Sequence, residues 1–472
     1  MGGRSNHVFL FLSYGLVIGL VLFSLHNSFF WDTVQLGSLH ANFYQSVQFS
    51  KLLLPDDFDS GHIPAFGIYI ALVWELFGKS LTSSHLAVLP FAIGVVFQLN
   101  LICKRFIRPE YSGLALLMIL IDPTLMSQIT LVSPDVPLAF FFLLGWNAVL
   151  NDRKLLITVG VLFLFLTSMR GMMVALCLLF ADIYLNTNLR KTAESLLSVI
   201  KRSLLYLPAF LIFAAYNWYH FVEKGWFIYH ENSPWADCFA PVDLRGFAFN
   251  VGILGWRLVD FGRIGIWMVF VTLAISHRKQ LFKSQQSRML LGFFFCVLVV
   301  LPLNMLWAKN LLAHRYLMPV YIAFAMLTAH LLFSDLVGRK AKVLLASLWI
   351  IILLGGNWWI YPDKISKGWD STLAHHPYYE LRKKAIAYLD QQQVDFNEVA
   401  TFFPNTAAFS AIDLSGDERN FDTYSENAKY VFYSNIYNID DPTYDKLRTE
   451  YEVVKTFSNN GIYITIYKFK KD

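Results

Sequence analysis

The stretch VFLFLSYGLVIGLVLFSLHNSFFWDT, residues 8–33, combines a long apolar run with an acidic side chain just beyond its end. The run at 8–28 is long enough to cross a bilayer, because a spanning helix needs about 20 mostly apolar residues. It is too long for a removed signal peptide and lacks the small-residue cleavage site of one. Since Arg4 precedes the run, we expect a first span that begins on the cytoplasmic side.

The composition of the whole chain supports a membrane protein. Of its 472 residues, 56% are hydrophobic and only 15% are charged, and the mean hydropathy of +0.45 excludes an ordinary soluble protein. The net charge of +5 is carried in short clusters between apolar runs, which argues against nucleic-acid binding. The four cysteines have no CxxC or Cys/His spacing, so we expect neither a disulfide framework nor a zinc site.

Further apolar runs predict an α-helical polytopic protein with about eleven transmembrane helices and an outer carboxyl terminus. The later spans are expected at 86–103, 111–131, 135–150, 155–169, 171–187, 203–222, 256–276, 289–306, 316–335 and 343–361. This assignment places every basic cluster on the cytoplasmic side, as the positive-inside rule requires. The clusters lie at 104–108, 151–154, 189–202, 277–283 and 338–342.

Two regions of different composition flank or interrupt the spans. Residues 29–85 have few basic side chains and are expected to form a long outer loop, in which the short apolar run 64–78 is a helix lying at the interface. The transmembrane domain is predicted to comprise residues 1–361. Residues 362–472 are polar and predict a small extracytoplasmic α/β domain, with a buried strand in AKYVFYSNI, a short helix in DDPTYDKLRTEY and a hairpin at Asn460-Gly461.

The depth of the ionisable residues is informative, because a charge near the bilayer centre costs several kcal/mol and persists for a reason. Here these residues gather at the predicted outer ends of the spans. An outward-facing polar cavity is therefore expected. The candidate residues are Asp32, His62, Asp135, Arg170, Arg263, Arg315 and Tyr316.

A carboxylate and several cationic groups at this depth suit transfer chemistry at a lipid phosphate. An Asp side chain can accept the proton of an acceptor hydroxyl, and burial beside Trp31 favours a more basic carboxylate. An Arg guanidinium binds two phosphate oxygens at once and stays charged. Cations of this kind stabilise the negative charge on a departing phosphate.

The same residues carry a family resemblance. WDT at 31–33, followed by GHIPAFGIYIALVWELFGKSLTSSH at 61–85, resembles the first-loop signature of GT-C glycosyltransferases that use polyprenyl-phosphate sugars, a superfamily that includes protein O-mannosyltransferases and the lipid A aminoarabinose transferase. SPDVPLAFFFLLGW at 133–146 is similar to the second acidic motif of that superfamily. HRYLMPVY at 314–321 is similar to its Arg-Tyr-x-x-Pro motif, and the resemblance covers about residues 8–361.

The resemblance implies roles for individual residues. Asp32 matches the catalytic base, and Asp135 matches the second acidic residue, which supports the acceptor or the donor head group. His62 and Pro64 fall where the family has a basic residue before paired prolines, although Ile63 replaces the first proline.

It also implies a donor, a cofactor requirement and a location. The donor is a polyprenyl-phosphate-linked sugar, transferred singly and with inversion to a lipid, glycan or protein acceptor on the outer face. No cofactor is expected, because WDT at 31–33 lacks the second acid of an Asp-Glu pair; a divalent metal is not favoured but stays open. Small loops and the absence of a retention signal favour a bacterial inner membrane, with a periplasmic active site, over the endoplasmic reticulum.

Simpler interpretations of the same residues stay open. Asp32 and Asp135 are also plausible helix caps, and an Arg at a helix end often reaches toward lipid head groups. Residues 56–59 are expected to form a solvated turn, and Arg257, Asp260 and Arg263 have a helical spacing that lets them pair with one another.

Two other functions compete with the transferase. A transporter or flippase of a lipid-linked glycan also has many spans and a polar cavity, but it needs polar groups along a path through the bilayer, often on two repeated halves. The chain shows neither feature. A non-catalytic membrane scaffold would leave the outer Asp and Arg residues unexplained.

Overall fold

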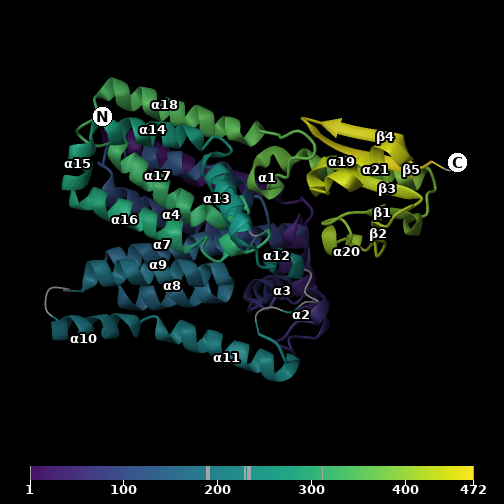
Figure 1. The fold of residues 1–472 in the computed structure, drawn as a ribbon, viewed down its shortest axis with the longest axis horizontal. Helices are drawn as coiled ribbons and strands as arrows, with labels where there is room; N and C mark the ends of the chain where they lie inside the picture. Colours follow the sequence, from purple (N-terminus) through teal and green to yellow (C-terminus); the bar gives the residue numbers. More distant parts are fainter. Residues whose placement is uncertain (1, 188–191, 228–229, 231–234, 311, 471–472) are drawn as a thin grey trace.

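A computed structural model describes residues 2–187, 192–227, 230, 235–310 and 312–470. Figure 1 shows a body of roughly aligned helices with a β-sheet beyond one end of it. The amino terminus lies at the opposite end of the helices from the sheet. The predicted class, a helical membrane protein with a small C-terminal α/β region, is confirmed.

The helices of the body follow one another with short connections. They are α1 Gly2–Ser24, α2 His40–Ser46, α3 Ala65–Phe77, α4 Leu81–Phe106, α5 Ser112–Leu120, α6 Pro123–Ile129, α7 Asp135–Leu150, α8 Lys154–Thr167, α9 Met169–Asn186, α10 Thr192–Ser203, α11 Leu207–Lys224, α12 Ala236–Phe239, α13 Leu244–Val259, α14 Ile264–Ser276, α15 Arg278–Lys283, α16 Gln285–Val300, α17 Met318–Leu332 and α18 Arg339–Gly355. A π-helix at Val34–Leu39 precedes α2.

Six helical segments in the described part of the chain are long and apolar enough to cross a membrane: Asn6–Ser24, Leu81–Phe106, Met169–Asn186, Gln285–Trp307, His314–Leu332 and Arg339–Trp358. Three bent pairs raise the number to nine when each pair is counted as one span: α5 with α6, α10 with α11, and α13 with α14. The shorter apolar helices α3, α7 and α8 come in addition. The expected total of about eleven crossings stays a prediction.

Two predicted spans are interrupted: the run 111–131 is divided into α5 and α6, which meet at an angle of 72°, and the run 256–276 is divided as well. The run 256–276 is not a continuous helix, because α13 and α14 meet at an angle of 87°. Gly262 at the break has a φ of +82°, and a Cβ atom there would lie 2.2 Å from the carbonyl oxygen of Ile352. Only glycine therefore fits where the chain turns against α18. The apolar pattern concealed the break because both halves are themselves apolar.

The basic clusters lie at the end of the helices away from the sheet, where α10 and α15 are seen in Figure 1. Arg105 donates a hydrogen bond to Asn151 at 3.0 Å, and Arg202 pairs with Asp152 at 2.5 Å, so three of these clusters are neighbours. Residues 189–191 of the cluster at 189–202 lie outside the described residues. The grouping on one end agrees with the predicted topology.

The C-terminal region is a five-stranded sheet with helices on it. The strands are β1 Val399–Thr401, β2 Asp422–Thr423, β3 Tyr430–Ser434, β4 Tyr451–Asn459 and β5 Ile462–Phe469, in the order β2-β1-β3-β5-β4. Strands β1, β2 and β3 are parallel, and β5 is antiparallel to β3 and β4. Helices α19 Pro377–Gln391, α20 Phe409–Ile412 and α21 Asp441–Glu450 accompany the sheet.

The predicted strand in AKYVFYSNI is β3, the predicted short helix is α21, and the predicted hairpin joins β4 to β5. Asn460 and Gly461 both have positive φ, as the tight two-residue turn between such strands requires.

Two apolar cores meet at the junction of the helical body and the sheet. The larger core fills the helical body, and the smaller one lies under the sheet. Phe30, from the loop after α1, belongs to the smaller core and stacks on His375 with ring centroids 4.7 Å apart. The first loop is therefore anchored in the C-terminal region one residue before the Trp31-Asp32 pair.

Candidate active site

An open cavity lies where the first loop meets the ends of several helices. It contains about 960 Å³ of empty space, its open mouth included. Five of the seven predicted site residues line it: Asp32, His62, Arg170, Arg315 and Tyr316. Leu36, Phe66, Met169, Trp235, Phe239 and Met305 supply most of the apolar lining.

Asp32 faces the cavity from the start of the first loop. Trp31 before it has a φ of +52°, a strained conformation for a bulky residue, and Thr33 after it exchanges hydrogen bonds with the backbone of Phe30 at 2.7 and 2.8 Å. The Asp32 carboxylate forms an ion pair with Arg315. In the described chain no capping hydrogen bond from Asp32 is found, so the geometry favours a site residue over a helix cap.

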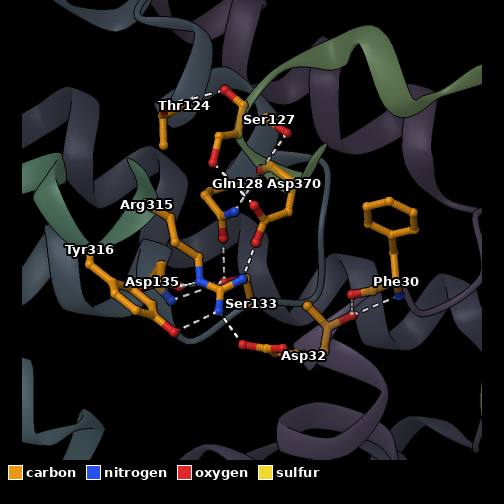
Figure 2. Close-up of polar contacts among 12 residues, drawn as sticks. Phe30, Asp32, Thr124, Ser127, Gln128, Ser133, Asp135, Arg315, Tyr316 and Asp370 are labelled. Atoms are coloured by element: carbon orange, nitrogen blue, oxygen red, sulfur yellow. Dashed lines mark hydrogen bonds and ion pairs between the residues drawn. The ribbon is translucent and has the colours of Figure 1, made fainter. Parts of the chain in front are cut away.

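Arg315 is the hub of the polar contacts in Figure 2, and it contacts three carboxylates. Nη1 donates to Asp370, Nη2 donates to Asp32 and to the Tyr316 hydroxyl at 3.0 Å, and Nε lies 3.4 Å from Asp135. The planar guanidinium is thus held at each of its edges. Arg315 precedes α17, in the turn His314–Leu317.

Asp135 and Arg170 form the second ion pair of the site. Asp135 is the first residue of α7, is buried, and accepts hydrogen bonds from Arg170 and from the Ser133 hydroxyl. It does not cap its helix and does not line the cavity. Arg170 does line the cavity, and its guanidinium lies 4.0 Å above the Tyr316 ring. A buried carboxylate therefore holds the arginine that faces the open space.

The rest of the first loop contributes two ionisable residues to this region, His62 and Asp59. His62 lines the cavity, and no hydrogen-bond partner of its buried Nδ1 is found among the described residues. Burial, aided by the positive charge of Arg170, lowers the pKa of His62 to about 4, so the ring is neutral at pH 7. A neutral imidazole next to a guanidinium can serve as a hydrogen-bond donor or acceptor for a bound ligand.

The expected solvated turn at 56–59 is wrong for its last residue. Asp59 is fully buried and accepts hydrogen bonds from His220 at 3.1 Å, from Lys224 at 2.6 Å and from the Gly61 amide at 2.8 Å. Burial alone would raise the pKa of Asp59, but these hydrogen bonds lower it below its usual value. Asp59 therefore fastens the loop that carries His62 to the end of α11.

Arg263 does not belong to this cavity. Its guanidinium donates to both Asp122 oxygens at 2.7 and 2.8 Å and to the Thr124 hydroxyl at 2.6 Å, and it is 1% exposed. Within 257–263 the expected ion pairing holds for Arg257 and Asp260, at 3.8 Å, whereas Arg263 donates to the backbone carbonyl of Asp260 at 3.3 Å. The expectation that Arg263 holds a donor phosphate therefore has no geometric support, because its donors are directed at Asp122, which caps α6.

Sequence reasoning missed Asp370. This residue follows the last span, lies in the turn Trp369–Ser371, and is buried against Arg315. Burial raises the pKa of Asp370, and the nearby Asp32 carboxylate adds to this effect while Arg315 opposes it. A signal was present, because Trp369-Asp370-Ser371 repeats the Trp-Asp-hydroxyl pattern of WDT at 31–33.

A second contact that sequence reasoning did not predict fixes the residue next to Arg315. The break between α13 and α14 carries Asp260, whose carboxylate accepts hydrogen bonds from His314 at 2.8 Å and from the Tyr361 hydroxyl at 2.6 Å. His314 directly precedes Arg315, so the interrupted span helps to fix the turn that presents the guanidinium.

Among the described residues no group of three or more His, Cys, Asp or Glu side chains is arranged to hold a metal ion.

The architecture is that of a membrane protein whose polar site lies at the ends of its helices, beneath a C-terminal α/β region. Comparison with protein-family models and with curated protein sequences finds no match. Among solved structures, ArnT from Cupriavidus metallidurans bound to undecaprenyl phosphate is similar over 97% of both chains, with 12% identity and a TM-score of 0.50.

The apo state of the same ArnT is similar over 98% of both chains, with 11% identity and a TM-score of 0.50. The chain therefore shares the ArnT fold, and the predicted GT-C-like architecture is confirmed at the level of fold. It is an integral membrane protein.

Proposed function

We propose that this protein is a GT-C glycosyltransferase that transfers one sugar from a polyprenyl-phosphate carrier to an acceptor on the outer face of a bacterial inner membrane. The observation that carries the proposal is the cavity in which Asp32 and two arginines meet. The full-length likeness to an ArnT structure that contains undecaprenyl phosphate supports a lipid-phosphate donor.

The proposed reaction is a single displacement at the anomeric carbon. The oxygen of the acceptor hydroxyl forms the new glycosidic bond while the bond from the anomeric carbon to the phosphate oxygen breaks. Asp32 accepts the hydroxyl proton, and the polyprenyl phosphate leaves with the electron pair. The configuration at the anomeric carbon is inverted.

Arg170 is the group proposed to hold the donor phosphate. Only its Nη1 has a protein acceptor in the part of the chain that the structure describes, so Nε and Nη2 can serve a ligand in the cavity. His62 is proposed to add a neutral hydrogen bond beside it, and Tyr316 supports the guanidinium from below. Arg315 contributes its charge at the cavity wall, although its hydrogen bonds are directed to Asp370, to Asp32 and to the Tyr316 hydroxyl.

The test uses cells that lack the protein, with and without a plasmid that carries the wild-type gene. Mass spectrometry of envelope lipids, glycans and glycopeptides is expected to show a species heavier by one sugar only in the complemented cells. This result would also identify the sugar and the class of acceptor. Accumulation of a lipid-linked glycan on the inner leaflet of the deletion strain, with no single-sugar product missing, would contradict the transferase and favour the transporter.

A further inference from the structure

The segment that follows the last membrane span supplies a side chain to the site. Asp370 lies between α18 and α19, 3% exposed, and does not line the cavity. Its Oδ2 accepts a hydrogen bond from Nη1 of Arg315, and its Oδ1 accepts one from the Ser371 hydroxyl at 3.1 Å. The carboxylate thus reaches Arg315 from the side away from the open space.

The backbone around Asp370 is fixed to α6 by side chains of the helical body, as Figure 2 shows. The Asp370 carbonyl accepts hydrogen bonds from the Ser127 hydroxyl at 2.7 Å and from the Gln128 amide at 2.8 Å. The Ser371 carbonyl accepts one from the Thr124 hydroxyl at 3.2 Å. Three polar side chains of α6 therefore hold this short segment in place. Because burying hydroxyl and amide groups costs free energy unless they form hydrogen bonds, these contacts indicate more than packing.

The guanidinium of Arg315 is oriented by the carboxylates around it. Asp370 holds Nη1, Asp32 holds Nη2, and Asp135 lies near Nε. Without the Asp370 charge, Nη1 loses its charge-assisted hydrogen bond, and the planar group is held less firmly against rotation about its remaining partners. Such a rotation would also move Asp32, because the two side chains share an ion pair.

We propose that Asp370 is a positioning residue of the site, which fixes Arg315 and through it the orientation of Asp32 toward the acceptor hydroxyl. This inference rests on the proposed function for its catalytic consequence. It means that the active centre is completed by the segment joining the last span to the C-terminal sheet. A misplacement of a catalytic group by about 1 Å can cost about 100-fold in rate.

The test is a double-mutant cycle in full-length protein. Variants Asp370→Asn, Arg315→Lys and the double variant are compared with the wild type by the rate at which the single-sugar product forms in complemented cells, per folded molecule. Asp370→Asn is expected to lower that rate by about 100-fold. Because Asp370 acts through Arg315, the double variant should be no slower than Arg315→Lys alone.

Two variants control for other causes. Asp390→Asn also removes a carboxylate from an Asp–Arg pair, with Arg419, but that pair is exposed on the C-terminal region and away from the cavity; its rate should equal that of the wild type. Asp370→Glu, which keeps the charge, should recover part of the lost rate. Additive losses in the cycle, or a wild-type rate in Asp370→Asn, would overturn the positioning role while leaving the transferase intact.

A second readout does not depend on activity. Electron cryomicroscopy maps of wild-type and Asp370→Asn proteins in nanodiscs should show an ordered Arg315 side chain only in the wild type. An unchanged Arg315 in the variant would overturn the proposal. If the wild-type protein forms no sugar product at all, the proposed function fails, and these maps still decide whether Asp370 positions Arg315.

Discussion

Two arginine centres at the ends of the membrane helices use the same residue types in opposite ways. In one, Arg263 is enclosed by Asp122, Thr124 and the Asp260 carbonyl, and it stacks on the Tyr321 ring at 3.7 Å. In the other, Arg170 has a single described hydrogen bond and faces a cavity. In the first centre every guanidinium nitrogen has a protein acceptor, whereas in the second Nε and Nη2 have none among the described residues.

The difference shows that a buried Asp–Arg pair is not by itself a sign of function. A buried pair whose hydrogen bonds are all made holds helices together, and breaking it leaves an uncompensated charge. A functional arginine needs an anchor on one side and free donors on the other. Arg170 meets both conditions, because Asp135 anchors it and the cavity is open beside it.

The largest expected effect comes from breaking the closed centre, in which Arg263 is enclosed by its protein partners. Arg263→Gln should destabilise the protein by about 3–5 kcal/mol, because Asp122 is left buried without its cation. The measurement is the melting temperature in detergent together with the amount of protein in membranes. Arg419→Gln is the control, since exposed pairs contribute about 1 kcal/mol or less. Equal melting temperatures for the two variants would remove the structural role of Arg263.

At the open centre, where Arg170 faces the cavity, a substitution should change ligand binding more than stability. Arg170→Gln is expected to weaken binding of undecaprenyl phosphate by about 100-fold, equivalent to about 2.7 kcal/mol, because a charged donor to the phosphate is lost. Its melting temperature should fall much less than that of Arg263→Gln, because Arg315 still lies 3.4 Å from Asp135. Binding is measured in nanodiscs with undecaprenyl phosphate as the probe. Wild-type affinity in this variant would exclude Arg170 as the phosphate ligand.

The stability of the junction between the helical body and the C-terminal region, which contains Phe30 and Asp370, should depend on pH. Burial lowers the pKa of His375 from 6.5 to about 4, so the folded protein binds fewer protons than the unfolded chain in that range. Stability should therefore be lost as the pH falls below 6.5, by about 2 kcal/mol between pH 7 and pH 5 for this group. The melting temperature of His375→Gln should fall less over this interval than that of the wild type. Parallel curves would contradict the assignment.

The smallest effect is expected at the neutral wall of the cavity. His62→Gln should lower the rate of sugar transfer by about 10-fold, or about 1.4 kcal/mol, because it replaces one neutral hydrogen-bonding group by another in a different position. His7→Gln, exposed near the amino terminus, serves as the matched control. A loss as large as that of Arg170→Gln would indicate that His62 is charged or acts directly in the reaction.

Much of this architecture could be predicted from the sequence. Long apolar runs and basic clusters define helices and their ends with little dependence on tertiary structure, so the membrane class and the grouping of the basic loops were accessible. The site residues Asp32 and Arg315 could be predicted to gather because both follow or precede a span at the same end. Their contact distances depend on how the helices pack, which hydropathy does not encode.

The remaining features depend on contacts between distant segments. Asp59 looks solvated beside Asp56 and Asp57, yet its partners His220 and Lys224 come from α11, far along the chain. Asp370 lies in a polar segment that has no membrane signal of its own. In each case the decisive partner is more than 50 residues away in sequence, and only the fold brings it near.

The most direct test of the central claim is made with Asp32→Asn. Its rate of single-sugar transfer and its affinity for undecaprenyl phosphate are measured per folded molecule beside the wild type. If Asp32 is the base in the open centre, transfer should fall by about 1,000-fold or more, while binding of the lipid phosphate changes by less than about 3-fold. Retained transfer by a folded Asp32→Asn protein would contradict the account.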